Sequence, residues 1–286
     1  MTVGQIMSIV DVETAEVCPA CLRPRGVGRF RLPCGPSMPG VLVQYPEGGR
    51  SRMNYRRIAT VTGWLWIITF VTSIPARFVF YKPVIDHGNY VTGAGDDAMT
   101  LIAIGAALEL ILIIANIGTA VVPYSIHKRV NEAGALGYVT ARVMECMFIA
   151  VGLVCMLAIS TLRQDAPSGT DAALGQGLEA VYEWCFRLGP GFVVGVGNGL
   201  ILGWLMYKSE LMPRGLAMFG LIGGPLIIIS GILVILDVIE AGGSIQGLMT
   251  IPEAFWELSI GIYLIVKGYR TSAIAGLESP AAATTV

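Results

Sequence analysis

Four polar side chains lie inside stretches of sequence that are otherwise apolar, and their types could support proton chemistry within a membrane. They occur in two successive stretches: Glu109, Asn116, Arg142 and Glu145. Glu109 and Asn116 are two helical turns apart and share one face of a helix. Arg142 and Glu145 are three residues apart and can touch along another. A buried carboxyl near a guanidinium can bind and release a proton, as in proton-coupled membrane transport.

The two stretches are joined by a short basic segment, so we expect them to pack as an antiparallel pair of helices. All four side chains then lie at similar depth. Because two carboxyls share one guanidinium, we expect one of them, Glu109, to be protonated at neutral pH. The alternative is structural, because buried polar residues also join helices by hydrogen bonds worth about 0.6 to 2 kcal/mol each.

The elements that must position these residues are membrane-spanning helices. About 20 mostly apolar residues are needed to cross a bilayer, and six stretches are long enough: 58–76, 99–124, 136–162, 189–207, 216–236 and 251–266. Apolar residues make up 54% of the chain and charged residues 14%, which excludes an ordinary soluble globule. The predicted fold class is all-α, a polytopic membrane bundle of about six transmembrane helices.

The distribution of Lys and Arg predicts the orientation of the bundle. One side of the predicted membrane carries most of them: Arg50, Arg52, Arg56, Arg57, Lys128, Arg129, Lys208, Arg214, Lys267 and Arg270. The other side has Arg77, Lys82, Arg163 and Arg187. We therefore expect both termini to be cytoplasmic, in a multi-pass protein of the bacterial inner membrane.

Three further polar residues are secondary site candidates: Asn198, Asp237 and Glu257. Asn198 lies beside the glycines of the fourth stretch, whereas Asp237 and Glu257 lie nearer the outer ends of their helices. Glu253 follows Pro252 and is expected at a helix start, where the helix dipole stabilises a carboxylate. Trp256 is expected to anchor the helix at the outer interface.

Glycine and proline patterns predict how the later helices pack. The fourth stretch carries a glycine at every fourth position, which favours close approach of a neighbouring helix: Gly191, Gly195, Gly199 and Gly203. Gly223, Gly224 and Pro225 permit a kink in the fifth stretch. Residues 170–187 are amphipathic and predict a short interfacial helix, after which the Gly-Pro-Gly sequence at 189–191 would turn the chain into the membrane.

The ends of the chain differ in composition from residues 53–270, which form the predicted six-helix domain. We expect residues 1–52 to be either a disordered cytoplasmic tail or a segment upstream of a true start at Met53, and residues 271–286 to be a disordered cytoplasmic tail. Cys18, Cys21 and Cys34 could supply three zinc ligands, but structural zinc sites usually have four and this tail has no His. No metal site is therefore predicted.

The sequence motifs give little support to an enzymatic function. The sequence lacks G-x-S-x-G, H-E-x-x-H and a phosphate-binding loop, so no enzymatic activity, catalytic residue or cofactor is predicted. The net charge of −1 gives no bias toward nucleic acid. The expected partner is the lipid bilayer, together with other membrane helices or further copies of the chain.

Several strings resemble, in order, the bacterial membrane proteins of the domain of unknown function 4386 family. They are YRRIATVTGWLWIITF, LELILIIANIGTAVVPYSIHKRVNEAGALGYVTARVMEC, LGPGFVVGVGNGLILGWLMYKSELMPRGLAMFGLIGGPL and PEAFWELSIGIYLIVKGY. The resemblance covers about 53–270, and these positions are similar to the family's recurrent polar or Pro sites: Glu109, Asn116, Arg142, Glu145, Pro190, Pro225, Glu253 and Glu257. It implies a multi-helix membrane fold and no established activity.

Three functional hypotheses follow, and the third is an intramembrane enzyme that acts on lipid. The first is a permease for a small molecule or ion in which Glu109 exchanges a proton. The second is a non-catalytic membrane subunit or sensor that binds partner helices, motivated by the glycine stripe. The sequence identifies neither the solute nor a partner.

Overall fold

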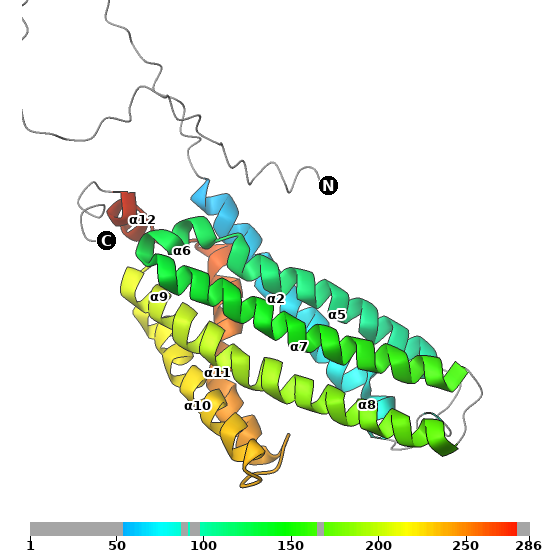
Figure 1. The fold of residues 1–286 in the computed structure, drawn as a ribbon. Coiled ribbons are helices and arrows are strands. Elements are labelled where there is room, and N and C mark those ends of the chain that lie inside the picture. Colours follow the sequence, from blue (N-terminus) through cyan, green and yellow to red (C-terminus); the bar gives the residue numbers. More distant parts are fainter. Residues whose placement is uncertain (1–53, 87–90, 92–97, 165–168, 279–286) are drawn as a thin grey trace, which may run out of the picture. The chain divides into compact units, whose positions relative to one another are not determined.

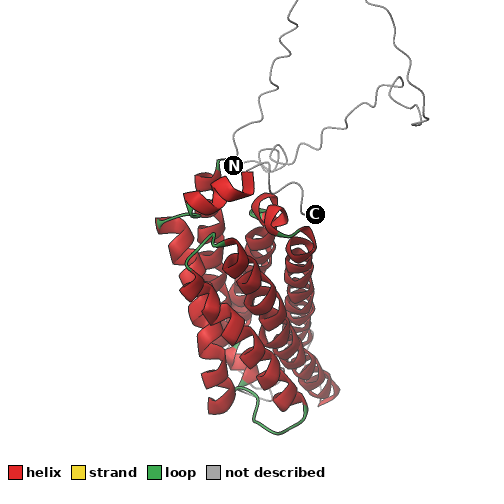
Figure 2. Cartoon of the chain, turned by 90° about the vertical axis from the view of Figure 1, so that its left-hand side faces the viewer, coloured by secondary structure: helices red, strands yellow, loops and turns green. Residues whose placement is uncertain are grey.

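The computed structural model describes residues 54–86, 91, 98–164 and 169–278, and these residues form helices and loops without strands (Figure 2). Six helical segments are long and apolar enough to cross a membrane: Tyr55–Phe80, Met99–Val121, Glu132–Gln164, Asp171–Ser209, Arg214–Ile235 and Ser244–Val266. The predicted all-α bundle of about six transmembrane helices is confirmed. Residues 1–53, which include the three tail cysteines, lie outside the described residues.

The elements follow one another as α2 (Tyr55–Pro75), π-helical η2 (Ala76–Phe80), α3 (Lys82–Ile85), α5 (Ala98–Val121), α6 (Tyr124–Val130), α7 (Glu132–Gln164), α8 (Gly169–Leu188), π-helical η3 (Gly189–Val193) and η4 (Gly195–Leu202), α9 (Gly203–Ser209), α10 (Arg214–Ile235), α11 (Ser244–Val266) and α12 (Thr271–Glu278). The first span consists of α2 and η2. The fourth joins α8, η3, η4 and α9.

The six spans pack as a closed ring, and Figure 1 shows from the side how α7 lies between α5 and α8. Going around it, α2 packs on α5, α5 on α7, α7 on α8 and η4, η4 on α10, α10 on α11, and α11 on α2. Large apolar side chains point away from the ring, among them Val71, Phe78, Ile114 and Val154. Such an apolar exterior suits a lipid environment, where polar groups must be satisfied inside the bundle.

The fourth span is one continuous helix, so the predicted interfacial helix with a turn at residues 189–191 is wrong. The backbone N–H of Val194 donates to the carbonyl of Gly189, five residues back, which is π-helical bonding. This wider turn accommodates Pro190, which lacks an N–H. Near the end of α8, Glu183 is directed inward, because it forms an ion pair with Arg77 at 2.7 Å.

Three of the four glycines of the predicted stripe, Gly195, Gly199 and Gly203, face α10. A Cβ on Gly195 would lie 2.7 Å from the carbonyl oxygen of Gly224, and one on Gly203 would lie 3.3 Å from the nitrogen of Leu221. A Cβ on Gly199 would overlap the Cα of Gly224. At the far end, the oxygen of Gly191 lies close to Gly231. The stripe therefore lets two backbones of the same chain approach each other.

A helix, α12, occupies part of the segment that we expected to be a disordered tail. Its Ile274 is buried against an apolar core that includes Trp66, Trp256, Tyr138 and Tyr269. The hydroxyl of Tyr55 donates to Glu278 at 2.5 Å, and Arg129 lies 3.9 Å from the same carboxylate. These contacts stabilise residues 271–278 against the ends of two other helices, so this part of the prediction is corrected.

The burial of His127, on α6, leads us to expect that the stability of the protein depends on pH. Its side chain is 2% exposed, it packs beside Tyr138 and Tyr269, and neither ring nitrogen has a hydrogen-bond partner among the described residues. Burial lowers the pKa of His127 to about 4, against about 6.5 in an unfolded chain. Between these values the unfolded chain binds a proton that the folded protein does not. The free energy of unfolding therefore has its full value, as far as His127 is concerned, above about pH 6.5. It falls by up to about 3 kcal/mol as the pH decreases toward about 4.

Melting of the detergent-solubilised protein from pH 7.5 to pH 4.5, beside the variant His127→Phe, measures this effect. The wild type is expected to lose more stability than the variant over the acidic part of the range. Parallel curves would show that the proton on His127 does not control acid stability.

Candidate functional site

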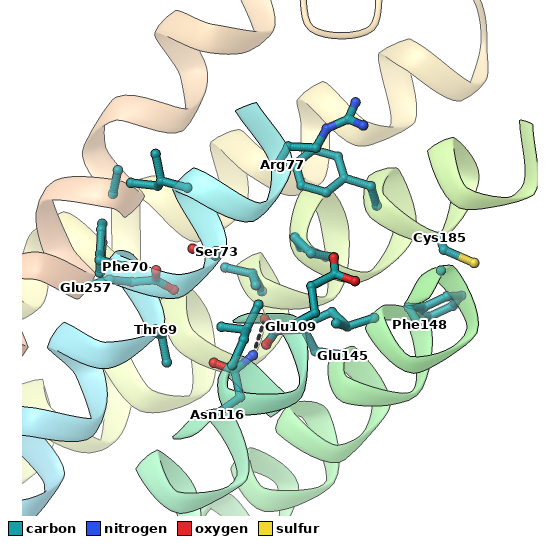
Figure 3. Close-up of a pocket in the computed structure, with 18 of the residues that line it drawn as sticks. Thr69, Phe70, Ser73, Arg77, Glu109, Asn116, Glu145, Phe148, Cys185 and Glu257 are labelled. Carbon is teal, nitrogen blue, oxygen red and sulfur yellow. Dashed lines mark hydrogen bonds between the residues drawn. The ribbon is translucent and has the colours of Figure 1, made fainter. Parts of the chain in front are cut away.

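A cavity of about 380 Å³ lies inside the ring, and all six spans contribute to its wall (Figure 3). Its charged lining comes from six residues: Arg77, Glu109, Arg142, Glu145, Glu253 and Glu257. Aromatic and aliphatic side chains such as Phe70, Phe148 and Ile227 fill the space between them. An apolar cavity with a few convergent polar groups is the usual form of a small-molecule site.

Three of the four residues in the predicted cluster are joined by hydrogen bonds. Arg142 forms an ion pair with Glu145 at 2.7 Å, and Asn116 donates to the other oxygen of Glu145 at 3.1 Å. The Nε of Arg142 also donates to Thr119 at 3.1 Å, and its guanidinium lies 4.6 Å from the ring centre of Trp66. Arg142 is 2% exposed and Glu145 is 5% exposed, so this ion pair is buried.

Glu109 lines the same cavity but has a different partner. The hydroxyl of Tyr81 donates to its carboxylate at 2.9 Å. Burial first, and then the nearby charge of Glu109, raise the pKa of Tyr81 above its usual range, so Tyr81 keeps its proton and remains a donor. Figure 3 shows Glu109 and Glu145 near the same space, with Asn116 bonded to Glu145. Glu109 therefore lines the same cavity as the ion pair of Arg142 and Glu145 but is bonded to Tyr81 instead.

Two expectations for α11 need correction. Glu253 does not start a helix, because α11 begins nine residues earlier at Ser244, and its carboxyl is 1% exposed inside the bundle. Trp256 is fully buried, not interfacial, and its Nε1 donates to the carbonyl of Asn198 at 2.9 Å. The side-chain amide of Asn198 donates to Glu257. Sequence position did not reveal which face of α11 is turned inward.

Arg77 is a cavity residue that the sequence analysis assigned only to an outer boundary. It lies in η2, just after Pro75, and its side chain is 15% exposed. The guanidinium pairs with Glu183 and lies 4.6 Å from the ring centre of Phe186. The π-helical turn carries it into the bundle. No local sequence signal distinguishes it from a cation at the end of a span.

The remaining predicted residues lie around the cavity or away from it. Asn198 is buried in η4 next to the α11 wall, whereas Asp237 is exposed just after α10. Helix α10 continues through Pro225, and Gly223 and Gly224 pack against α11 and η4. Within the described residues, no cluster of three or more His, Cys, Asp or Glu side chains could hold a metal.

A family model described as Domain of unknown function (DUF4386) matches residues 61–268. No curated protein and no solved structure matches the chain. The matched residues run from within α2 to just beyond α11, so they include most of the first span, all of the other five and every residue that lines the cavity. The chain therefore belongs to the Domain of unknown function (DUF4386) family, as the resemblance predicted.

Proposed function

We propose that this protein is a permease for a small polar molecule or ion, which binds in the cavity at the centre of the six-helix ring. The observation that carries the proposal is a set of buried polar atoms in the cavity wall that have no hydrogen-bond partner among the described residues. They include Nη2 of Arg142 and both carboxylate oxygens of Glu253. A polar solute would supply these partners.

Energetics support this interpretation over a purely structural one. A buried donor or acceptor that is left unpaired costs about 1 to 3 kcal/mol, and more when it is charged. A bundle that needed polar groups only to hold its helices together would be expected to pair them within the protein. The volume of about 380 Å³ is also in the range of small-molecule sites.

Glu109 is the residue that we propose for proton exchange. Its carboxyl accepts one hydrogen bond from Tyr81, while Glu145 is held in the ion pair with Arg142. Adding a proton to Glu109 therefore leaves that ion pair intact. Adding one to Glu145 would remove the charge that pairs with Arg142.

Proteoliposomes that contain a pH-sensitive dye test the proposal. A panel of amino acids, monocarboxylates, alkylammonium salts and alkali chlorides is added outside, and the internal pH is followed. We expect at least one solute to move protons in the wild type, and Glu109→Gln to slow this movement by roughly tenfold or more. Glu240→Gln, which changes an exposed carboxyl outside the cavity, is expected to leave it unchanged. Proton movement no faster than in protein-free liposomes, for every solute in the panel, would contradict the proposal.

The glycine stripe gives less support to a subunit or sensor that binds a partner helix through it, because α10 of the same chain packs against these glycines. The proposal also places the protein in a bacterial inner membrane with both termini in the cytoplasm. The distribution of Lys and Arg supports that orientation.

A further inference from the structure

The α11 side of the cavity gathers buried oxygen atoms with few hydrogen-bond donors. Glu253 is 1% exposed, and neither of its carboxylate oxygens has a partner among the described residues. Asn198 is fully buried, and its Oδ1 is also without a partner there. The amide nitrogen of Asn198 donates to Glu257, which places this amide beside the second carboxyl of α11. Glu253 and Glu257 are one helical turn apart and share a face of α11.

Close packing fixes the position of the Glu253 carboxylate. A Cβ on Gly223 would lie 2.7 Å from its Oε2, and a Cβ on Gly199 would lie 2.9 Å from the same oxygen. The carboxylate therefore occupies space that two side-chain-free positions leave on η4 and α10. Its place is set by shape and not by hydrogen bonds, and it lines the cavity without a hydrogen-bond partner among the described residues.

The charges around these oxygens favour a cation. The two guanidiniums of the cavity wall already have anionic partners, since Arg142 pairs with Glu145 and Arg77 pairs with Glu183. Among the described residues, no ion pair is formed by Glu253 or Glu257. The charge of Arg142 acts on both carboxyls but forms no ion pair with either. Two neighbouring buried carboxylates without an ion-pair partner are costly, and a bound cation would lower that cost.

We propose that Glu253, Glu257 and the Oδ1 of Asn198 bind a monovalent cation, either an alkali metal ion or the ammonium group of a solute. Both are recognised by the same chemistry, a small set of oxygen acceptors with net negative charge. A divalent ion fits less well, because Ca²⁺ needs six to eight oxygen ligands and Mg²⁺ retains several waters in near-octahedral geometry. The inference rests on the proposed function, because it names a class of ligand for the same cavity.

The test is thermal melting of the full chain in detergent at pH 8, in choline chloride and in equal concentrations of NaCl, KCl or methylammonium chloride. Choline is a bulky control cation at the same ionic strength. At about ten times its Kd, a bound cation is expected to raise the melting temperature by about 3 to 6 °C. A rise in NaCl or KCl identifies a metal ion, and a rise in methylammonium chloride identifies an ammonium group.

The matched variants are Glu253→Gln and Asn198→Ala, with Glu240→Gln as the control. Each variant is compared with itself in choline chloride, so a change in its own stability does not affect the result. The first two are expected to lose most of the salt-specific rise, and the control is expected to keep it. Equal melting temperatures in all four salts would overturn the inference and leave a proton as the species that neutralises the carboxyl pair. A salt-specific rise in melting temperature that persists in Glu253→Gln would also overturn the inference.

The liposome assay distinguishes the failure of the proposed cation site from the failure of the proposed permease function. Cation-specific stabilisation without movement of any solute would retain the site and contradict transport. Proton movement that depends on Glu109, without any cation-specific stabilisation, would retain transport and contradict the site.

Discussion

Replacing Arg142 with Met is expected to lower the free energy of unfolding by about 3 to 5 kcal/mol, because the substitution leaves the carboxylate of Glu145 buried without a counter-charge. Arg142 is 2% exposed, pairs with Glu145 at 2.7 Å and packs over Trp66. Met fills much of the volume of the aliphatic stem of Arg142, so the main loss is electrostatic. Thermal unfolding of the detergent-solubilised protein measures the change.

The double variant Arg142→Met with Glu145→Met identifies the source of that loss. It removes both charges, so much of the lost stability is expected to return even though the hydrogen bonds to Asn116 and Thr119 are gone. If the double variant is less stable than Arg142→Met alone, then the packing and hydrogen bonds of these side chains matter more than the unpaired charge.

Replacing Gly199 with Ala is expected to destabilise the fold by about 1 to 3 kcal/mol, despite the higher helix propensity of Ala. The new Cβ would lie 2.8 Å from the backbone nitrogen of Gly224 and 2.9 Å from Oε2 of Glu253. Backbone atoms cannot rotate out of the way as a flexible side chain can, so η4 and α10 must separate. The melting temperature in detergent reports the effect.

Gly177→Ala and Gly215→Ala are the controls for this substitution. A Cβ at either position meets nothing within 4 Å. Both variants are therefore expected to be as stable as the wild type, or more stable by up to about 1 kcal/mol. An unchanged melting temperature for Gly199→Ala would mean that η4 and α10 can move apart at little cost.

The membrane spans could be predicted from the sequence because hydropathy is local and each crossing needs an apolar run of minimum length. The described spans include the predicted stretches apart from a few residues at their ends, and several extend beyond them. The Gly-Pro-Gly sequence was misread because the same residues can end a helix or occupy a π-helical turn. Contacts such as Arg77 with Glu183 draw α8 into the bundle, and they join residues more than 100 positions apart.

The site was harder to predict because it depends on which face each helix turns inward. Arg142 and Glu145 could be paired from their spacing alone, since one helix positions both. Glu253 could not be placed in this way, because its burial depends on Gly199 and Gly223 of other helices. The hydrogen-bond partner of Glu109 could not be predicted from local spacing either, because Tyr81 belongs to another part of the chain, just after the first span.

The third and fourth spans are longer than a typical bilayer is thick. At about 1.5 Å per residue, α7 with its 33 residues is about 50 Å long, and the 39-residue fourth span is longer still. Both exceed the 40 to 45 Å of a typical bilayer with its headgroups. Because α6 and α9 pack together at the other end of these spans, the surplus projects at the ends formed by Gln164 and Gly169. The fourth span also carries Tyr182 and Pro190 of the cavity wall, so its projecting end and that wall belong to one continuous helix.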